Sequence, residues 1–266
     1  MIMKQFRYEP LAQASYLLAC PRAKEAIVVD PIDNLGAEFY VLEAADLGLA
    51  ITAVLETHVH ADYISCAREL AEMNGVPHYL NEKAKGLVQY EFTPFADGHV
   101  FEVGGVRIEA MHTPGHTPEH TSYLVTDTAR SDDPWFVLTG DSLFVGDVGR
   151  PDLLIGDQAL DVMGEEDRAA TLYRSVTEKL FALPDFVEVY PNHYGGSTCG
   201  GVNMSGKAGS TIAFEKKFNL AMRQPTAEDF ARFVKETSKP FPDDYQRIKS
   251  YNLGLISKEE VQGASA

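Results

Sequence analysis

Residues 57–63 read T-H-V-H-A-D-Y and follow a short, β-branched apolar run that is typical of a buried strand. His58, His60 and Asp62 stand at alternate positions and carry the imidazole and carboxylate groups that hold metal ions in proteins. Tyr63 ends the stretch with a phenol, whose pKa of about 10 makes it a poor ligand for a labile divalent ion at neutral pH. The stretch therefore predicts a metal site at the end of a strand, with one unexpected residue in it.

Three later segments place the same kinds of side chain after predicted strands. His116 lies in T-P-G-H-T-P-E-H, Asp141 in T-G-D-S-L-F and His193 in Y-P-N-H. Taken singly, each histidine is more simply explained as a hydrogen-bonded loop residue, and Asp62 as a helix N-cap. Because functional loops gather at one edge of a sheet, the ordered set instead predicts one shared site. Imidazole and carboxylate without thiolate suit Zn, Fe(II) or Mn(II) better than a structural cysteine site.

The chain alternates short apolar runs with segments of helical periodicity, so we expect an α/β fold with two sheets and helices outside them. Gly104 and Gly105 mark the turn of a hairpin, and Asp62 is placed to cap a helix that ends at Gly75. Strands are expected at 4–8, 14–20, 26–30, 51–57, 100–113, 121–126, 135–141 and 187–193. Helices are expected at 35–48, 62–75, 165–182, 210–222 and 226–238, followed by a polar tail.

The charge balance limits the classes of partner. The 266-residue chain carries 23 Lys and Arg residues against 39 Asp and Glu residues, a formal net charge of -16. This balance disfavours nucleic acid and anionic membranes, and no apolar run approaches the roughly 20 residues of a membrane span. Three widely spaced cysteines without a C-x-x-C pair fit a reducing compartment. We therefore expect a soluble, cytoplasmic protein.

The sequence resembles the metallo-β-lactamase superfamily in three blocks, T-H-V-H-A-D, T-P-G-H-T-P-E-H-T-S-Y and G-D-S-L-F-V-G-D-V-G-R-P-D-L. The last block and the stretch at 190–219 are most similar to the persulfide dioxygenases, including those fused to rhodanese modules. The resemblance covers roughly residues 10–220 and implies an αβ/βα four-layer sandwich with the metal at one edge. We therefore expect residues 1–224 to form a metallo-β-lactamase-like catalytic domain. Residues 225–266 are expected to be a C-terminal helical extension and tail of the same domain.

The resemblance also implies a ligand set. In the two-metal hydrolases of this superfamily the first block reads H-x-H-x-D-H, and Tyr63 replaces the last histidine, so the second metal position should be empty or weak. The persulfide dioxygenases imply one Fe(II) per chain, with zinc possible in purified protein, on the catalytic residues His58, His116 and Asp141. His60 is either a fourth ligand or, as we favour, a hydrogen-bonding group behind the ligands. The other residues expected near the metal are Asp62, Tyr63 and His193.

The activity implied by this branch is oxidation of a low-molecular-weight thiol persulfide by O2 to sulfite and the thiol. A zinc thioesterase of the glyoxalase II type is the leading alternative, which Tyr63 disfavours. A metal or persulfide sensor without catalysis is a further alternative. The implied partners are the persulfide, O2 and a sulfurtransferase of the rhodanese type, and a homo-oligomer is compatible with the sequence. The sequence does not identify the thiol that carries the persulfide.

Four further residues are candidates for contact with the substrate. Cys199, in G-G-S-T-C-G-G, could hold or relay a sulfane sulfur, or it could be an inert loop thiol. Arg150 could bind a substrate carboxylate, although an ion pair with a neighbouring aspartate of D-V-G-R-P-D is the simpler interpretation. Tyr123 and Tyr194 could touch the substrate or the oxygen bound at the iron, with core packing the alternative for Tyr123.

Overall fold

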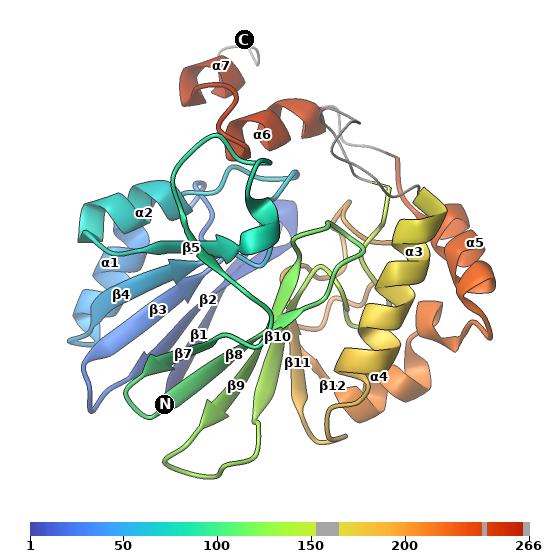
Figure 1. The fold of residues 1–266 in the computed structure, drawn as a ribbon, viewed down its shortest axis with the longest axis horizontal. Coiled ribbons are helices and arrows are strands. Elements are labelled where there is room, and N and C mark those ends of the chain that lie inside the picture. The colour runs from blue at the N-terminus through green and yellow to red at the C-terminus, as the bar shows by residue number, and fades with distance from the viewer. Residues whose placement is uncertain (153–164, 241–243, 263–266) are drawn as a thin grey trace.

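The computed structural model describes residues 1–152, 165–240 and 244–262, which form two mixed sheets packed face to face (Figure 1). The strand order is β1-β2-β3-β4-β5-β6 in the first sheet and β12-β11-β10-β9-β8-β7 in the second. The first sheet comprises β1 (Ile2–Tyr8), β2 (Gln13–Cys20), β3 (Glu25–Val29), β4 (Ala50–Leu55), β5 (His78–Asn81) and β6 (Thr93–Phe95). The second comprises β7 (Val100–Val103), β8 (Val106–His112), β9 (Thr121–Asp127), β10 (Phe136–Gly140), β11 (Glu188–Pro191) and β12 (Ser210–Thr211).

Both sheets combine antiparallel and parallel pairs. Strands β1 to β3 form an antiparallel meander, and β3 to β6 run parallel to one another. In the second sheet, β7 to β10 are antiparallel, β10 and β11 are parallel, and β12 closes the edge antiparallel to β11. Because parallel strands end at the same edge, the loops after β4, β10 and β11 are brought to one end of the molecule.

Helices cover the outer face of each sheet, as Figure 1 shows. Tyr40 and Leu70 belong to the apolar cluster under the helices of the first sheet, and Leu172 and Phe230 to the cluster under those of the second. The helices on the first sheet are α1 (Ala37–Asp46) and α2 (Ala67–Asn74). Those on the second sheet are α3 (Glu165–Arg174), which continues as a π-helix at Ser175–Leu180, α4 (Ile212–Phe218) and α5 (Ala227–Thr237).

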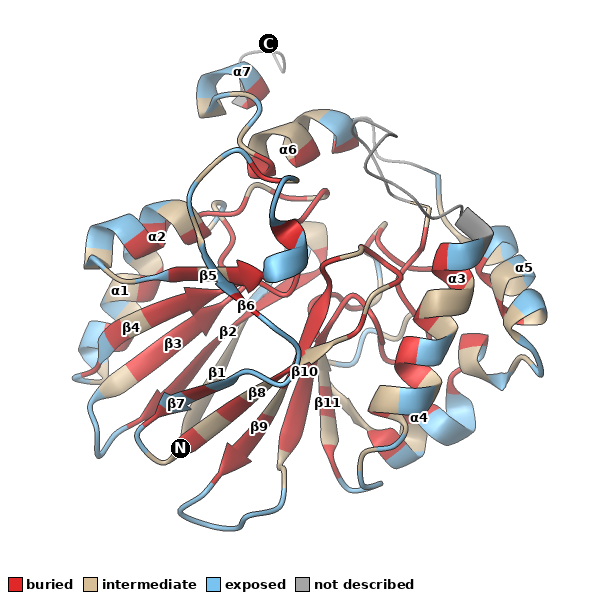
Figure 2. Ribbon diagram, in the orientation of Figure 1, coloured by how far each residue is buried: buried red, intermediate tan, exposed pale blue. Residues whose placement is uncertain are grey.

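The main apolar core lies between the two sheets. It includes Tyr16 and Leu18 of β2 together with Ile108, Tyr123 and Leu138 of the second sheet. Figure 2 shows that buried residues concentrate on the strands, whereas the helices expose their outer faces. This distribution is what burial of one apolar stripe per helix and two apolar faces per sheet produces. The predicted α/β fold with four layers is therefore confirmed.

The prediction that Asp62 caps a helix is wrong. Helix α2 begins at Ala67, and its N-cap residue is Cys66, whose side chain makes no capping hydrogen bond. The Ser65 hydroxyl accepts a hydrogen bond from the Ala67 N–H instead. Residues 57–66 form an irregular loop, and both side chains and backbone groups from elsewhere in the fold bind its polar groups. We call residues 57–66 the ligand loop.

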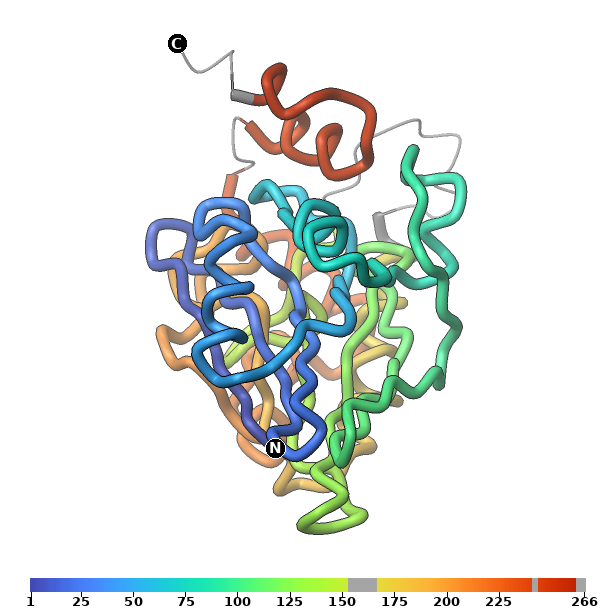
Figure 3. The backbone as a smooth tube through the Cα atoms, turned by 90° about the vertical axis from the view of Figure 1, so that its left-hand side faces the viewer, coloured from blue at the N-terminus to red at the C-terminus, as the bar shows by residue number. Residues whose placement is uncertain are grey.

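The C-terminal part of the chain also differs from the prediction. The helix expected at 210–222 is shorter, because β12 occupies Ser210–Thr211 and α4 ends at Phe218. The expected polar tail contains two helices, α6 (Tyr245–Asn252) and α7 (Lys258–Gln262). Both views in Figures 1 and 3 place them beyond the strand ends, at the opposite end of the molecule from the N-terminus.

Some of the predicted features lie outside the described residues, namely Leu153 at the end of G-D-V-G-R-P-D-L and the tail segments at 241–243 and 263–266. Among the described residues, no helix has both the length and the apolar character needed to cross a membrane.

Candidate metal centre

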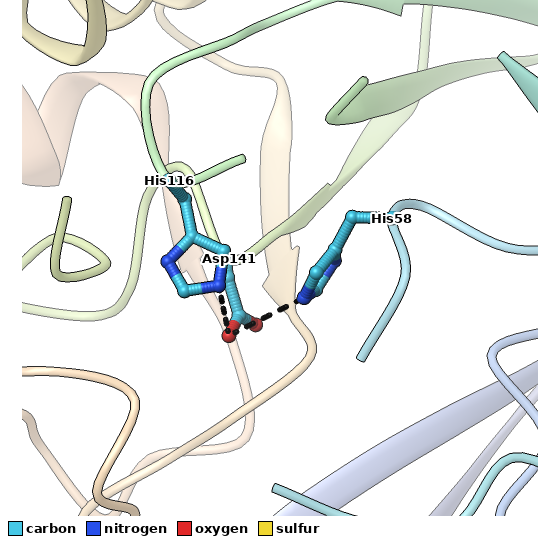
Figure 4. A group of neighbouring side chains, drawn as sticks. All are labelled: His58, His116 and Asp141. Atoms are coloured by element: carbon cyan, nitrogen blue, oxygen red, sulfur yellow. Dashed lines mark ion pairs between the residues drawn. The ribbon is translucent and has the colours of Figure 1, made fainter. Parts of the chain in front are cut away.

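Three of the predicted site residues meet at the carboxyl ends of the strands. His58 follows β4, His116 follows β8 and Asp141 follows β10 directly, and one ligand atom from each lies within 4.8 Å of the other two (Figure 4). Asp141 Oδ2 is 3.5 Å from His116 Nε2 and 3.9 Å from His58 Nε2. All three side chains are buried. Two imidazoles and one carboxylate facing each other form a donor set that suits a divalent transition metal.

Hydrogen bonds at the far side of each ring fix the tautomer of both histidines. His116 Nδ1 lies 2.8 Å from the Arg150 carbonyl oxygen, which only accepts, so Nδ1 carries the proton. His58 Nδ1 lies 2.9 Å from the Thr57 hydroxyl, and that hydroxyl donates to Asp30 at 2.9 Å, so its oxygen accepts from His58. Each Nε2 atom is therefore unprotonated, and its lone pair faces Asp141.

The electrostatics of the three residues also fit a cation. Burial lowers the pKa of His116 to about 3 and holds the pKa of His58 well below its usual value, so both rings are neutral. Burial raises the pKa of Asp141 to about 7, and neither of its carboxylate oxygens has a hydrogen-bond donor among the described residues. A buried carboxylate without a donor is unfavourable unless a cation binds it. These observations show that the residues fit a metal ion.

Backbone contacts hold Asp141 in this position. Its N–H donates to His120 Nε2 at 2.9 Å, and the Thr113 and Ser142 hydroxyls lie against His120 Nδ1 at 2.9 and 3.0 Å. Gly149 passes so close that a Cβ atom there would lie 1.9 Å from the Asp141 carbonyl oxygen. Only glycine therefore fits at position 149, in the G-D-V-G-R segment.

A second group of donors lies beside the first. Asp62, His193 and Cys199 each place one ligand atom within 4.8 Å of the other two. Asp62 Oδ2 and His193 Nε2 are 3.0 Å apart, and His193 Nε2 is 3.8 Å from Asp141 Oδ2. Burial opposes both charges, but the Asp62 carboxylate raises the pKa of His193 to about 9, and His193 lowers that of Asp62 to about 2. Burial and the two aspartates hold the pKa of the Cys199 thiol well above its usual value.

His60 and Tyr63 lie beside each other, with His60 next to Asp30 and Tyr63 near His193 of the second donor group. His60 Nε2 is 3.1 Å from Asp30 Oδ1, and its ring stacks on Tyr63 at a centroid distance of 4.4 Å. The Tyr63 hydroxyl accepts a hydrogen bond from Asn192 at 3.3 Å, and burial holds its pKa well above the usual value. A neutral, hydrogen-bonded phenol therefore occupies position 63, where the family resemblance led us to expect that one ligand of a second metal is missing. His60 is not part of the donor group of His58, His116 and Asp141.

The accessory candidates lie in different environments. Arg150 is buried and binds both carboxylate oxygens of Asp152, at 2.6 and 2.7 Å, which is the ion pair that the sequence suggested. Tyr123 lies in the main core and donates its hydroxyl proton to the Glu56 carbonyl oxygen at 2.7 Å. The ring of Tyr194 lies under the Arg7 guanidinium at 3.9 Å. Only Cys199, of these four residues, belongs to a donor group.

Several residues of the site were missed in the sequence. Asp30 follows the strand A-I-V-V, adopts a left-handed φ of 53°, and binds both the N–H and the hydroxyl of Thr57. The signal was present, because Asp30 ends a strand as Asp141 does. His120 lies in the same T-P-G-H-T-P-E-H block as His116. Lys249 and Asn252, from α6, gave no comparable signal.

The comparison with known proteins places the chain in a family. The sequence profile of the metallo-beta-lactamase superfamily matches residues 8–193. The chain therefore belongs to the metallo-beta-lactamase superfamily, as its two sheets, outer helices and donor groups at one edge lead one to expect.

Individual relatives include a metallo-beta-lactamase and proteins named ETHE1. The structure of a metallo-beta-lactamase from Staphylococcus aureus is 31% identical, with a TM-score of 0.85 over 96% of this chain and 73% of the other. The structure of ETHE1 from Myxococcus xanthus is 26% identical, with a TM-score of 0.78 over 96% of this chain and all of the other. Human mitochondrial persulfide dioxygenase ETHE1 is 26% identical over 244 residues, covering 91% of this chain and 84% of the relative.

Proposed function

We propose that this protein is an Fe(II)-dependent persulfide dioxygenase that oxidises the persulfide of a low-molecular-weight thiol. The observation that carries the proposal is the group of His58, His116 and Asp141 beside a phenol at position 63. His58, His116 and Asp141 would hold a non-haem iron through two imidazoles and one carboxylate, a ligand set that would leave room for a sulfur ligand and O2. Similarity to persulfide dioxygenases over most of the chain supports the same reaction.

The overall reaction consumes one persulfide, one O2 and one water, and it yields the thiol R–SH, sulfite and two protons. The sulfane sulfur loses the electrons that reduce O2, and the S–S bond breaks with its electron pair going to the thiol sulfur. The iron supplies the capacity to bring O2 and the sulfur into reaction. The protein therefore has to hold the metal, orient the persulfide and exclude other thiols.

The chain's own residues have distinct parts in this proposal. Thr57 and the Arg150 carbonyl hold His58 and His116 with their Nε2 atoms facing Asp141. Asp141 contributes the negative charge that offsets part of the charge of a divalent ion. Cys199 lies with Asp62 and His193 next to this group, and we assign it the place where a sulfane sulfur is held or relayed. A sulfurtransferase of the rhodanese type is the proposed source of persulfide.

A metal-dependent hydrolase is the second candidate, and one observation favours it. Asp62, His193 and Cys199 offer a carboxylate, an imidazole and a thiol within 4.8 Å of one another, which suits zinc. A second metal bound there would create a two-metal site despite Tyr63. Such a site activates water for attack on a carbonyl. Burial keeps the Cys199 thiol protonated in the metal-free protein, so zinc would have to displace that proton.

One experiment separates the two candidates. Protein purified without oxidants is analysed for metal content, and O2 consumption is measured with persulfides of several thiols. The dioxygenase is expected to hold close to one iron per chain and to consume O2 only with a persulfide, forming sulfite. Two zinc ions per chain with hydrolysis of a lactoylated thiol would establish the hydrolase instead. Metal binding without either activity would favour the third alternative, a sensor of metal or persulfide that catalyses no reaction.

A further inference from the structure

Helix α6 reaches back across the fold to the ligand loop through Asn252. Its amide nitrogen donates to the carbonyl oxygens of His60 at 2.9 Å and Tyr63 at 2.8 Å. Its amide oxygen accepts the Ser65 N–H at 3.0 Å. Asn252 is buried, so water does not replace these bonds. One side chain therefore satisfies three backbone groups of the ligand loop, at a separation of 187 residues or more.

Lys249, one turn earlier on the same helix, binds the ligand loop directly after His58. Its ammonium donates to the carbonyl oxygen of Val59, the residue after His58. The Val59 N–H donates to the Glu119 carboxylate at 2.9 Å, so this residue is held through both of its backbone polar groups. Lys249 is only 5% exposed, burial lowers its pKa, and the Glu119 carboxylate opposes that shift. A buried ammonium needs hydrogen-bond acceptors, and the Val59 carbonyl supplies one.

Helix α6 and the residues that follow it are fixed to three segments in the first half of the chain. Arg68 of α2 donates to the Tyr251 carbonyl oxygen at 3.2 Å. The Gln89 N–H donates to the Leu253 carbonyl oxygen at 2.8 Å. Lys258, at the start of α7, forms an ion pair with Asp33, which precedes α1. The C-terminal helices thus dock on the first half of the chain, and they carry Lys249 and Asn252 to the loop.

We propose that Lys249 and Asn252 are positioning residues that couple the docking of helix α6 to metal binding at His58, His116 and Asp141. The backbone of the ligand loop aims His58, and the two side chains of α6 hold that backbone at Val59, His60 and Tyr63. Because linkage is reciprocal, a metal that requires the ordered loop also stabilises the docked helix. The inference rests on the proposed metal centre, but not on the reaction with persulfide.

Asn252→Asp is the most informative variant, because it keeps the acceptor for the Ser65 N–H and nearly the same volume. It replaces a donor by a carboxylate oxygen facing two carbonyl oxygens. Lys249→Met keeps the length of the side chain and removes the ammonium. Arg247→Met is the matched control, because Arg247 lies on the same helix but pairs with Asp244 at the surface.

Affinity is measured with Co(II), whose visible spectrum reports the coordination, and with Zn(II) in competition with a chelator. We expect Asn252→Asp and Lys249→Met to bind roughly 10–100-fold more weakly, as for other residues behind metal ligands, and Arg247→Met to bind as the wild type does. Unchanged affinity and an unchanged Co(II) spectrum in both α6 variants would overturn the coupling. Absence of metal binding by the wild-type protein would instead overturn the proposed centre, and the coupling with it.

A measurement on the wild-type protein alone keeps the inference testable if a variant does not fold. Hydrogen exchange of residues 245–252 is followed with and without Zn(II). The coupling predicts that zinc slows exchange in α6 as well as in the ligand loop, whereas α5, on the other sheet, is unchanged. Zinc that protects the loop but leaves exchange in α6 unaltered would refute the proposal.

Discussion

Replacing Asp141 by asparagine should affect the metal-free and the metal-bound protein in opposite directions. Asp141 is fully buried, and its two carboxylate oxygens receive no hydrogen bond within the described part of the chain. The bare Nε2 atoms of His58 and His116 face it at 3.9 and 3.5 Å. An asparagine amide of nearly the same shape removes the charge, and its N–H groups are able to donate toward these nitrogens.

The size of the effect follows from the pKa of Asp141, which burial raises to about 7. An aspartate in the unfolded chain has a pKa of about 3.9, so the folded state binds more protons between these two values. A raised folded pKa means that the stability contribution is present below pH 3.9 and is lost as the pH rises to 7. At about 1.4 kcal/mol per pKa unit, the wild-type protein loses roughly 2–3 kcal/mol relative to Asp141→Asn between pH 5 and pH 8. His193 keeps its partner Asp62 in both proteins, but the Asp141 charge also raises the pKa of His193, so this pKa should be lower in the variant.

Chemical denaturation at pH 5 and pH 8, with and without Zn(II), measures all four cases. Without metal, the stability of Asp141→Asn relative to the wild type should be roughly 2–3 kcal/mol greater at pH 8 than at pH 5. With zinc at about 100 times the dissociation constant, the wild type should gain about 2.7 kcal/mol and the variant little. Asp185→Asn is the control, because Asp185 pairs with Lys216 at the surface. A difference between wild type and Asp141→Asn that does not change with pH would refute the argument.

Four further substitutions test the site, each with its own measurement. His60→Ala should retain iron but lose roughly 10–100-fold in rate, because His60 binds Asp30 and stands outside the donor group; loss of iron would make His60 a ligand. Tyr63→His should bind more zinc per chain than the wild type under zinc excess, and equal stoichiometry would show that the phenol is not what limits the site. Cys199→Ser should keep iron and lose activity selectively with large or protein-bound persulfides; equal rates with every donor would make the thiol inert. Gly149→Ala should lower both the midpoint of thermal unfolding and the metal content, because its Cβ would lie 1.9 Å from the Asp141 carbonyl oxygen, and wild-type values for both would contradict this.

The sequence predicted the layers and the main donors because both depend on local patterns. A buried strand appears as a short apolar run, and the residue after it must lie at the edge of the sheet. This pattern marked His58, His116 and Asp141 among six candidates, the resemblance to the persulfide dioxygenases implied that these three are the ligands, and the structure brings them within 4.8 Å. Asp30 carried the same signal but stands far ahead of the H-x-H-x-D block, so it was not grouped with the other donors.

The errors arose where distant side chains override a local preference. Asp62 has a suitable position and side chain for an N-cap, yet its carboxylate lies 3.0 Å from His193, which comes 131 residues later. Asn252 and Lys249 bind the ligand loop, so the helix cannot begin before Ala67 without breaking those bonds. No local pattern contains this information. The spacing of Tyr245, Lys249 and Asn252 at helical intervals would have predicted α6, but not its position over the site.

The structure indicates that Cys199, as well as Tyr63, bears on how many metal ions the site binds. The family resemblance implies that Tyr63 stands where a second metal would need an imidazole, whereas the structure places the Cys199 thiol beside Asp62 and His193. In the proposed dioxygenase, a proton or a sulfane sulfur on Cys199 would make this group a poor zinc site. In the alternative hydrolase, zinc would displace that proton, and the same three residues would hold a second metal. Burial and the nearby aspartates raise the pKa of the Cys199 thiol, so the metal-free protein holds it protonated, and a second zinc would have to displace that proton to bind there.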